Sequence, residues 1–234
     1  MAIKGYLAMT AAEIAAAGAP AYGLAYMACH FSPYGTGLVN LPRELPEGAM
    51  LILNDRIPPR GHDPRQITEQ LLEVIRHCGC ECVLLDFQQP GCTELECLAQ
   101  SLSRSLPCPT AVSEAYAAGL SCPVFLPPVP PDVPLQAHLA SWGSREIWLE
   151  ISLEGLQIRL TEQGSFRTPL PYPAEDLPHP DEKLHCRYSI ATEPDAAIFT
   201  LQRTREDNTA LLREAETMGV TKSVGLWQEL SAFP

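Results

Sequence analysis

The sequence of residues 81–90 is Glu-Cys-Val-Leu-Leu-Asp-Phe-Gln-Gln-Pro. The apolar run near its start is typical of a buried strand, and polar side chains follow before the proline. In α/β barrels the strand bodies supply the core and the C-terminal strand tips carry the site. Because side chains alternate along a strand, we expect Asp86 and Gln88 to face one pocket and Phe87 to point the opposite way.

The chain before this stretch predicts a strand–helix–strand unit. Residues 50–53 are apolar and predict a strand, an Asp-Pro pair at residues 63–64 predicts the start of a helix, and Gly79 predicts its end. The strand quoted above follows at once, which is the order found in parallel sheets. We therefore expect an α/β fold, a small or incomplete TIM (β/α)8-type barrel that forms one domain over residues 1–234.

The remaining elements are predicted from the period of the apolar residues and from the Gly and Pro residues that end strands and helices. Further strands are expected at residues 3–9, 22–31, 110–116, 123–126, 185–190, 196–200 and 223–230, and helices at residues 10–18, 93–105, 135–142 and 206–219. Capping boxes are expected at Thr10 and Thr93.

The second half of the chain departs from a regular barrel. Residues 147–153 and 156–160 alternate apolar and polar side chains around Glu154-Gly155, which predicts a β-hairpin over residues 147–160 as a modification of the barrel. Residues 168–182 contain five prolines and predict an irregular loop.

Composition narrows the class of function. The net charge of -12 argues against nucleic acid as a partner, because no cluster of Lys and Arg offsets the phosphates. The sequence contains no run of 18 apolar residues, so we expect no membrane span. Residues 1–18 predict a helix start rather than a signal peptide, since Glu13 interrupts the apolar run. A cytoplasmic location is expected, and the sequence does not indicate the oligomeric state.

Nine cysteines are present, and without an export signal they are expected to be reduced thiols. Cys78, Cys80 and Cys82 form a Cys-x-Cys-x-Cys run with His77 beside it. A metal or redox site would need a fourth ligand at a suitable spacing, and no second Cys-x-x-Cys pair is present. We expect the three thiols to be small core residues that share one strand face, and we expect no metal or cofactor.

Residues 81–88 resemble the fourth-strand signature of glycoside hydrolase family 18, the chitinases and their relatives. That signature is Asp-Gly-x-Asp-x-Asp-x-Glu. Glu81 and Cys82 take the positions of the first Asp and the Gly. Leu84 takes the second Asp position, Asp86 the third, and Gln88 the position of the catalytic Glu. The resemblance implies a chitinase-like barrel in which one acidic residue is kept and the acid itself has become an amide.

The resemblance also implies roles for these residues. In family 18 the substrate's acetamido oxygen attacks the anomeric carbon, the signature Glu protonates the leaving oxygen, and the neighbouring Asp orients the acetamido group. Asp86 would keep the second role, whereas Gln88 can form hydrogen bonds but cannot deliver a proton. In family 18 a Trp in the last strand forms the floor of the sugar subsite, and Trp227 takes this position. The third-strand Ser-x-Gly-Gly and sixth-strand Met-x-Tyr-Asp motifs are missing.

Other polar residues fall near predicted strand ends. Asp55, Glu114 and Glu150 are candidates for a displaced acid, with Asp55 and Glu114 leading. Arg203 is expected to line the same mouth or to balance the charge of a neighbouring carboxylate. The candidate catalytic residues are therefore Asp86, Glu114 and Asp55, and the candidate ligand-binding residues are Asp86, Gln88, Trp227, Asp55, Glu114 and Arg203.

Three functions fit these observations. The first is a noncatalytic, pseudoenzyme-like protein that binds an N-acetylhexosamine-type carbohydrate or another small polar ligand. The second is an active glycoside hydrolase that uses Glu114 or Asp55. The third is a scaffold that serves protein contacts. Leu84 in place of an acidic residue favours the noncatalytic binding protein or the scaffold over the active hydrolase. The acidic strand tips favour a protein with a polar pocket over a closed scaffold.

Overall fold

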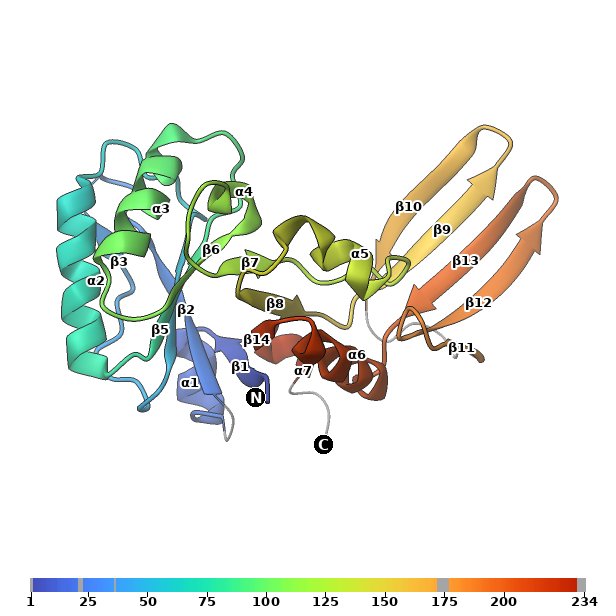
Figure 1. The fold of residues 1–234 in the computed structure, drawn as a ribbon, viewed down its shortest axis with the longest axis horizontal. Coiled ribbons are helices and arrows are strands. Elements are labelled where there is room, and N and C mark those ends of the chain that lie inside the picture. The colour runs from blue at the N-terminus through green and yellow to red at the C-terminus, as the bar shows by residue number, and fades with distance from the viewer. Residues whose placement is uncertain (1, 21–22, 36, 172–176, 231–234) are drawn as a thin grey trace.

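The computed structural model describes residues 2–20, 23–35, 37–171 and 177–230. Within them, eight parallel strands close into a barrel, because the first strand pairs with both the second and the last (Figure 1). In order around the barrel these strands are β1 (Lys4–Met9), β2 (Gly23–Phe31), β4 (Met50–Asn54), β5 (Cys82–Asp86), β6 (Thr110–Ser113), β7 (Val124–Leu126), β8 (Ile147–Ile151) and β14 (Val220–Leu226). The short β3 (Leu38–Val39) adds to β2 in antiparallel orientation. The expected TIM-type barrel is confirmed.

Helices follow most barrel strands and cover the outside. They are α1 (Ala11–Ala17), α2 (Pro64–Cys78), α3 (Thr93–Ser105), α4 (Glu114–Ala117), α5 (Leu135–Leu139) with the 3-10 turn Ala140–Trp142, α6 (Arg205–Thr217) and α7 (Trp227–Leu230). Helix α2 begins as expected, with the Asp63 side chain accepting from the Arg65 N–H, and ends at Gly79 in the left-handed conformation. The expected capping box at Thr93 is wrong: Cys92 is the N-cap and Thr93 is already the first helical residue.

A second sheet, here called the arm, projects from the barrel (Figure 1). It comprises β9 (Gly155–Thr161), β10 (Gly164–Leu170), β11 (His179–Asp181), β12 (Cys186–Glu193) and β13 (Ala196–Gln202), all antiparallel in the order β10-β9-β13-β12-β11. The expected hairpin over residues 147–160 is therefore wrong. Strand β8 pairs with its barrel neighbours β7 and β14, and β9 pairs with β10 and β13. The strand-like stretches within residues 185–200 belong to the arm and not to the barrel.

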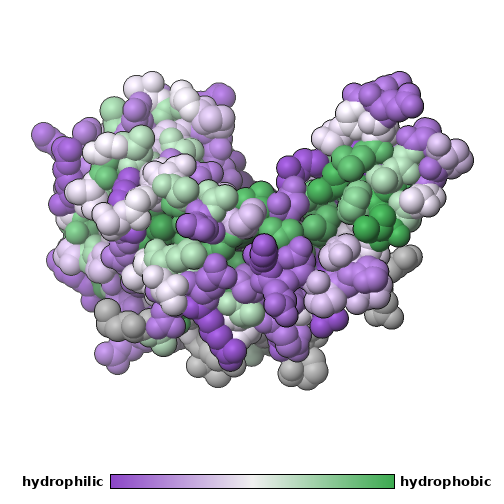
Figure 2. Space-filling model, turned by 45° about the vertical axis from the view of Figure 1, so that its right-hand side comes forward, coloured by the Kyte–Doolittle hydropathy of each residue, from purple (hydrophilic) through white to green (hydrophobic). Residues whose placement is uncertain are grey.

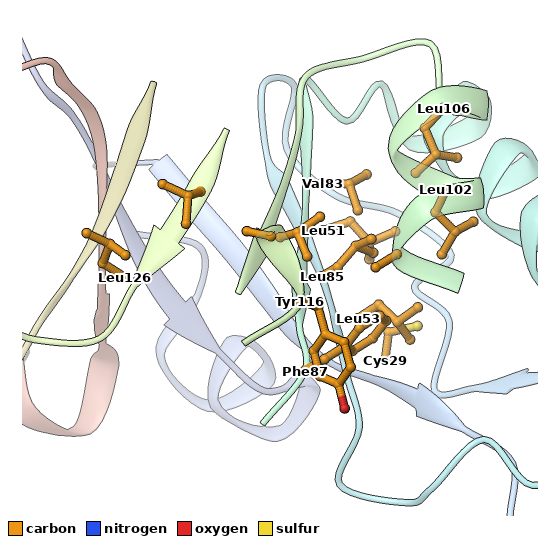
Figure 3. Packing of buried hydrophobic residues seen from close by; sticks show 14 of the residues in the cluster. Cys29, Leu51, Leu53, Val83, Leu85, Phe87, Leu102, Leu106, Tyr116 and Leu126 are labelled. Carbon is orange, nitrogen blue, oxygen red and sulfur yellow. The ribbon is translucent and has the colours of Figure 1, made fainter. Parts of the chain in front are cut away.

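Alternation along β5 divides its side chains between two cores. Val83, Leu85 and Phe87 point outward into the core between barrel and helices, where Phe87 meets Tyr116 edge-to-face (Figure 3). Leu84 points into the barrel with Cys82. The pattern expected for this strand is confirmed, and it directs the side chain of Asp86 toward the barrel axis.

The cysteine run does not lie on one strand face. Cys78 ends α2, Cys80 lies in the connection and packs in the outer core, and only Cys82 points into the barrel. All nine cysteines are unpaired thiols. Burial raises the pKa of Cys80 and of Cys82 to about 12, which keeps both protonated at neutral pH.

Candidate functional site

A cavity of about 700 Å³ opens at the C-terminal ends of the barrel strands. This is the end at which barrel enzymes carry their sites. Its apolar lining comes from inward-facing side chains: Met27, Ile52, Leu84, Phe125, Val224 and Leu226. Its polar lining consists of Thr10, His30, Asn40, Asn54, Asp55, Arg56, Asp86, Gln88, Gln89 and Glu150. An apolar floor with a few convergent polar groups is the usual composition of a small-ligand site.

Asp86 and Gln88 both line this cavity, as the strand alternation predicted. The Gln88 Nε2 amide donates to the Asp86 Oδ1 oxygen at 2.8 Å, and the Ser113 hydroxyl lies 3.5 Å from the same oxygen. Burial raises the pKa of the Asp86 carboxyl, and the nearby charge of Asp55 acts in the same direction, against the opposing effect of the two hydrogen bonds.

Asp55 holds the backbone that follows β5. The residue is 3% exposed, and its Oδ2 oxygen accepts from the N–H groups of Gln88 at 2.9 Å and Gln89 at 2.8 Å. The Gln89 side-chain amide donates in turn to the Asp55 carbonyl at 2.7 Å. A carboxylate engaged by two backbone donors is suited to shaping this loop. Asp55 is therefore a poor candidate for a displaced catalytic acid, although it lines the cavity.

Glu150 is the carboxylic acid best placed to exchange a proton in the cavity. It lies two residues after the inward-facing Trp148 on β8, and its strand partner is the inward-facing Val224. Burial, followed by the charges of Asp86, Glu229 and Glu154, raises its pKa to about 7. Among the described residues, none donates a hydrogen bond to this carboxyl.

Three of the expected site residues lie away from the cavity. Glu114 is exposed at the start of α4, because β6 ends at Ser113 and the strand expected over residues 110–116 stops before Glu114. Arg203 is 4% exposed and points into the joint between arm and barrel, where its guanidinium donates to backbone carbonyls. Trp227 packs against Met9, Leu24 and Ala49 outside the barrel interior.

Two lining residues, His30 and Asn40, form a polar pair that the sequence alone did not predict as a site. His30 Nδ1 lies 2.9 Å from the Phe31 carbonyl, so this nitrogen carries the proton and donates. His30 Nε2 then accepts from the Asn40 side-chain amide at 3.1 Å. His30 had a detectable signal, a polar residue at the tip of an apolar strand, whereas Asn40 lies beyond a turn and has none.

Asn54 lines the cavity at the tip of β4, next to the buried Asp55. Its side-chain amide donates to the carbonyls of Met27 at 2.9 Å and Cys29 at 3.0 Å, which fixes the tip of β2 against β4. Across the described ranges, no group of three or more His, Cys, Asp or Glu side chains could hold a metal ion. Nor does any helix in them have the length and apolar character needed to cross a membrane.

No family model matches the sequence, and neither does any curated protein. Solved structures do match. A chitinase from Chromobacterium violaceum superposes with a TM-score of 0.61 at 10% identity, covering 99% of this chain and 96% of that one. A Glu-to-Gln variant of a class V chitinase from Nicotiana tobaccum, in complex with NAG4, gives 0.56 at 10% identity, covering 96% and 93%.

The spore cortex-lytic enzyme SleL from Bacillus cereus gives a TM-score of 0.55 at 13% identity and covers 97% of this chain and 70% of its own. At these identities the likeness concerns the fold. The chain therefore has the α/β-barrel fold of these chitinases and of a spore cortex-lytic enzyme, which confirms the fold that the resemblance implied.

Proposed function

We propose that this protein binds an N-acetylhexosamine-type carbohydrate in the cavity at the barrel mouth and does not hydrolyse it by the family 18 mechanism. The observation that carries the proposal is the pair of Asp86 and Gln88 in one cavity, at the signature positions of the acetamido-orienting Asp and the catalytic Glu. An amide can donate and accept hydrogen bonds but has no acidic proton. Removing a general acid costs about 10²–10⁴-fold in rate.

The lining is also suited to a sugar. A pyranose ring has an apolar face, which Phe125 and Leu84 can contact, and hydroxyl groups, which can donate to the side-chain amide oxygens of Gln88 and Gln89. The tobacco structure with NAG4 supports an N-acetylglucosamine oligomer as the class of ligand to test first. The open cavity makes a scaffold without a ligand the weaker reading.

A second candidate function is hydrolysis by a displaced carboxylate. Of the acids considered from the sequence, Glu114 lies outside the cavity and Asp55 is bound by backbone N–H groups. Glu150 lies in the cavity with a pKa of about 7, within the range expected of a general acid at neutral pH. This alternative therefore rests on Glu150.

The test measures binding of the N-acetylglucosamine tetramer by calorimetry and its cleavage in the same samples. We expect the wild type to bind without cleavage, Asp86→Asn to bind about tenfold more weakly, and the exposed control Glu114→Gln to match the wild type. Cleavage that appears in Gln88→Glu would support a site still built for the family chemistry. Cleavage by the wild type that is lost in Glu150→Gln would favour the hydrolase, and absence of binding by the folded wild type would contradict the proposal.

A further inference from the structure

The charges that act on the cavity carboxyls of Asp86 and Glu150 are all negative. Glu150 lies within the influence of Asp86 on β5, Glu229 on α7 and Glu154 beyond β8, and each of them disfavours its ionised form. Asp86 is acted on in the same way by Asp55. The cavity therefore gathers negative charge that the surrounding elements do not neutralise.

The other titratable groups of the lining do not supply the missing cation. Arg56 is exposed at the rim, and it is not among the groups that stabilise the ionised form of either carboxyl. Both ring nitrogens of His30 are already engaged, with Nδ1 donating to the Phe31 carbonyl and Nε2 accepting from the Asn40 amide. A partly buried carboxylate without a counter-ion is unfavourable, and a cationic group that enters such a site gains the attraction of both carboxylates.

The floor limits which cation can enter. It is apolar over Leu84, Phe125 and Val224, and the volume of about 700 Å³ admits a group far larger than a metal ion. The described part of the chain also lacks the clustered ligands that a metal needs. A positively charged group attached to a ring with an apolar face meets both conditions, and an amino sugar is such a molecule.

We propose that the cavity selects hexosamine units with a free ammonium group, as in glucosamine oligomers, over their N-acetylated counterparts. The carboxylates of Glu150 and Asp86 serve as counter-ions of the ammonium group. This inference rests on the proposed carbohydrate function: N-acetylated oligomers bind in the same cavity, and oligomers with free ammonium groups bind there more tightly. Acetylation removes the charge and adds bulk, so it removes the ion pair while leaving the ring contacts and hydroxyl contacts in place.

The preference depends on pH in a defined direction. In the free protein Glu150 is protonated below about pH 7, so an ammonium ligand must expel that proton to form the ion pair. At pH 5 this lowers the affinity by up to about 100-fold. Above about pH 8 the amine of the sugar loses its own proton, if it ionises as an ordinary α-amine does. The affinity for glucosamine oligomers is therefore greatest near pH 7 to 8, whereas N-acetylated oligomers show no such maximum.

The experiment compares glucosamine tetramer with N-acetylglucosamine tetramer by calorimetry at pH 5, 7.5 and 9. The wild type is expected to bind the glucosamine tetramer at least about tenfold more tightly at pH 7.5. Glu150→Gln, which keeps the side-chain shape, should reduce the preference to less than about threefold and flatten the pH dependence. The exposed Glu114→Gln variant serves as the matched control and should retain the full preference.

The outcomes separate this inference from the proposal on which it rests. Equal or tighter binding of the N-acetylated tetramer by the wild type would overturn the selectivity and leave carbohydrate binding intact. A preference that survives unchanged in both Glu150→Gln and Asp86→Asn would overturn the role of the two carboxylates. If the folded wild type binds neither tetramer, the proposed function itself fails.

Discussion

The carboxyl of Glu150 holds its proton up to about pH 7, because burial and the charges of Asp86, Glu229 and Glu154 disfavour ionisation. The reference value for glutamate is 4.5, so between pH 4.5 and 7 the folded state retains a proton that the unfolded state releases. The contribution of this group to stability is therefore fully present below pH 4.5 and is lost as the pH rises to about 7.

Replacing Glu150 with Gln is expected to remove this dependence. The free energy of unfolding of Glu150→Gln should rise relative to that of the wild type between pH 4.5 and 8, by at most about 3 kcal/mol. Urea denaturation of both proteins across this range measures the difference. Glu114→Gln is the control because Glu114 is exposed. A difference between Glu150→Gln and the wild type that does not change with pH would contradict the raised pKa.

The sequence predicts the positions of some site residues and not of others. Asp86 follows from strand alternation, which is a local property of the backbone, and Gln88 keeps the same direction although β5 ends at Asp86. Trp227 does not follow from alternation, because β14 ends at Leu226 and a helical turn begins, so the strand period no longer fixes the direction of the side chain. The backbone carbonyls that bind Arg203 come from segments as many as 74 residues away in the sequence. Nothing in the local pattern indicates them.

The elements of the first half were largely predictable, whereas those of the arm were not. A strand of a barrel and a strand of an antiparallel sheet can share the same alternating pattern, and the choice of partner is made by distant segments. The prolines of residues 168–182 suggested a loop, yet Pro169 lies in β10 and Pro180 in β11. Both are edge strands of the arm, where proline is tolerated because one side of the strand needs no ladder hydrogen bonds.

Arg203, directly after β13, links the arm to the barrel by hydrogen bonds. Its guanidinium donates to the carbonyl of Val129, which follows β7, and to the carbonyls of Leu184 and His185, which precede β12. Burial lowers the pKa of this guanidinium, because the charged form loses its hydration. The hydrogen bonds to the carbonyls must offset this unfavourable free energy of desolvation. Arg203 thus joins three segments that are distant in sequence.

The variant Arg203→Met keeps most of the aliphatic volume and removes all of these donors. The buried carbonyls then lose their partners, and we expect a loss of about 3 kcal/mol in the free energy of unfolding. Urea denaturation measures the loss, and limited proteolysis should show earlier cleavage within the arm. Arg213→Met, on the exposed side of α6, is the control and should change stability by less than about 0.5 kcal/mol. Equal effects of the two variants would refute the role of Arg203.

On the scale of the whole molecule, the two ends of the barrel differ in character. At the N-terminal end of the strands, Glu81 accepts from Lys4 and from the Tyr6 hydroxyl, while Lys222 lies over the ring of the buried Trp148. These side chains close the barrel at the N-terminal end of its strands. The cavity therefore opens at the C-terminal end, where the carboxylates lie, and a ligand reaches it from that side.

The arm leaves the barrel beside this mouth and presents large apolar side chains to solvent, among them Leu160, Phe166 and Ile190 (Figure 2). Its strands pair with one another, and the barrel strands that flank the insertion pair within the barrel. None of the arm residues that the structure describes lines the cavity. The fold of the barrel and the binding of a ligand at its mouth are thus separable from the arm by experiment.

The last prediction concerns removal of residues 157–200, with a two-residue glycine linker that joins Leu156 to Leu201. These two residues are direct strand partners, and Gly155 lies against the Leu201 carbonyl, so the cut ends are already adjacent. Because the barrel pairings remain, we expect cooperative urea unfolding with a smaller m-value, in proportion to the surface removed. The free energy of unfolding should also fall, because Arg203 loses its hydrogen bonds to the Leu184 and His185 carbonyls. Affinity for the tetramer that the wild type prefers should change by less than about threefold. A folded variant that no longer binds would place part of the ligand site on the arm.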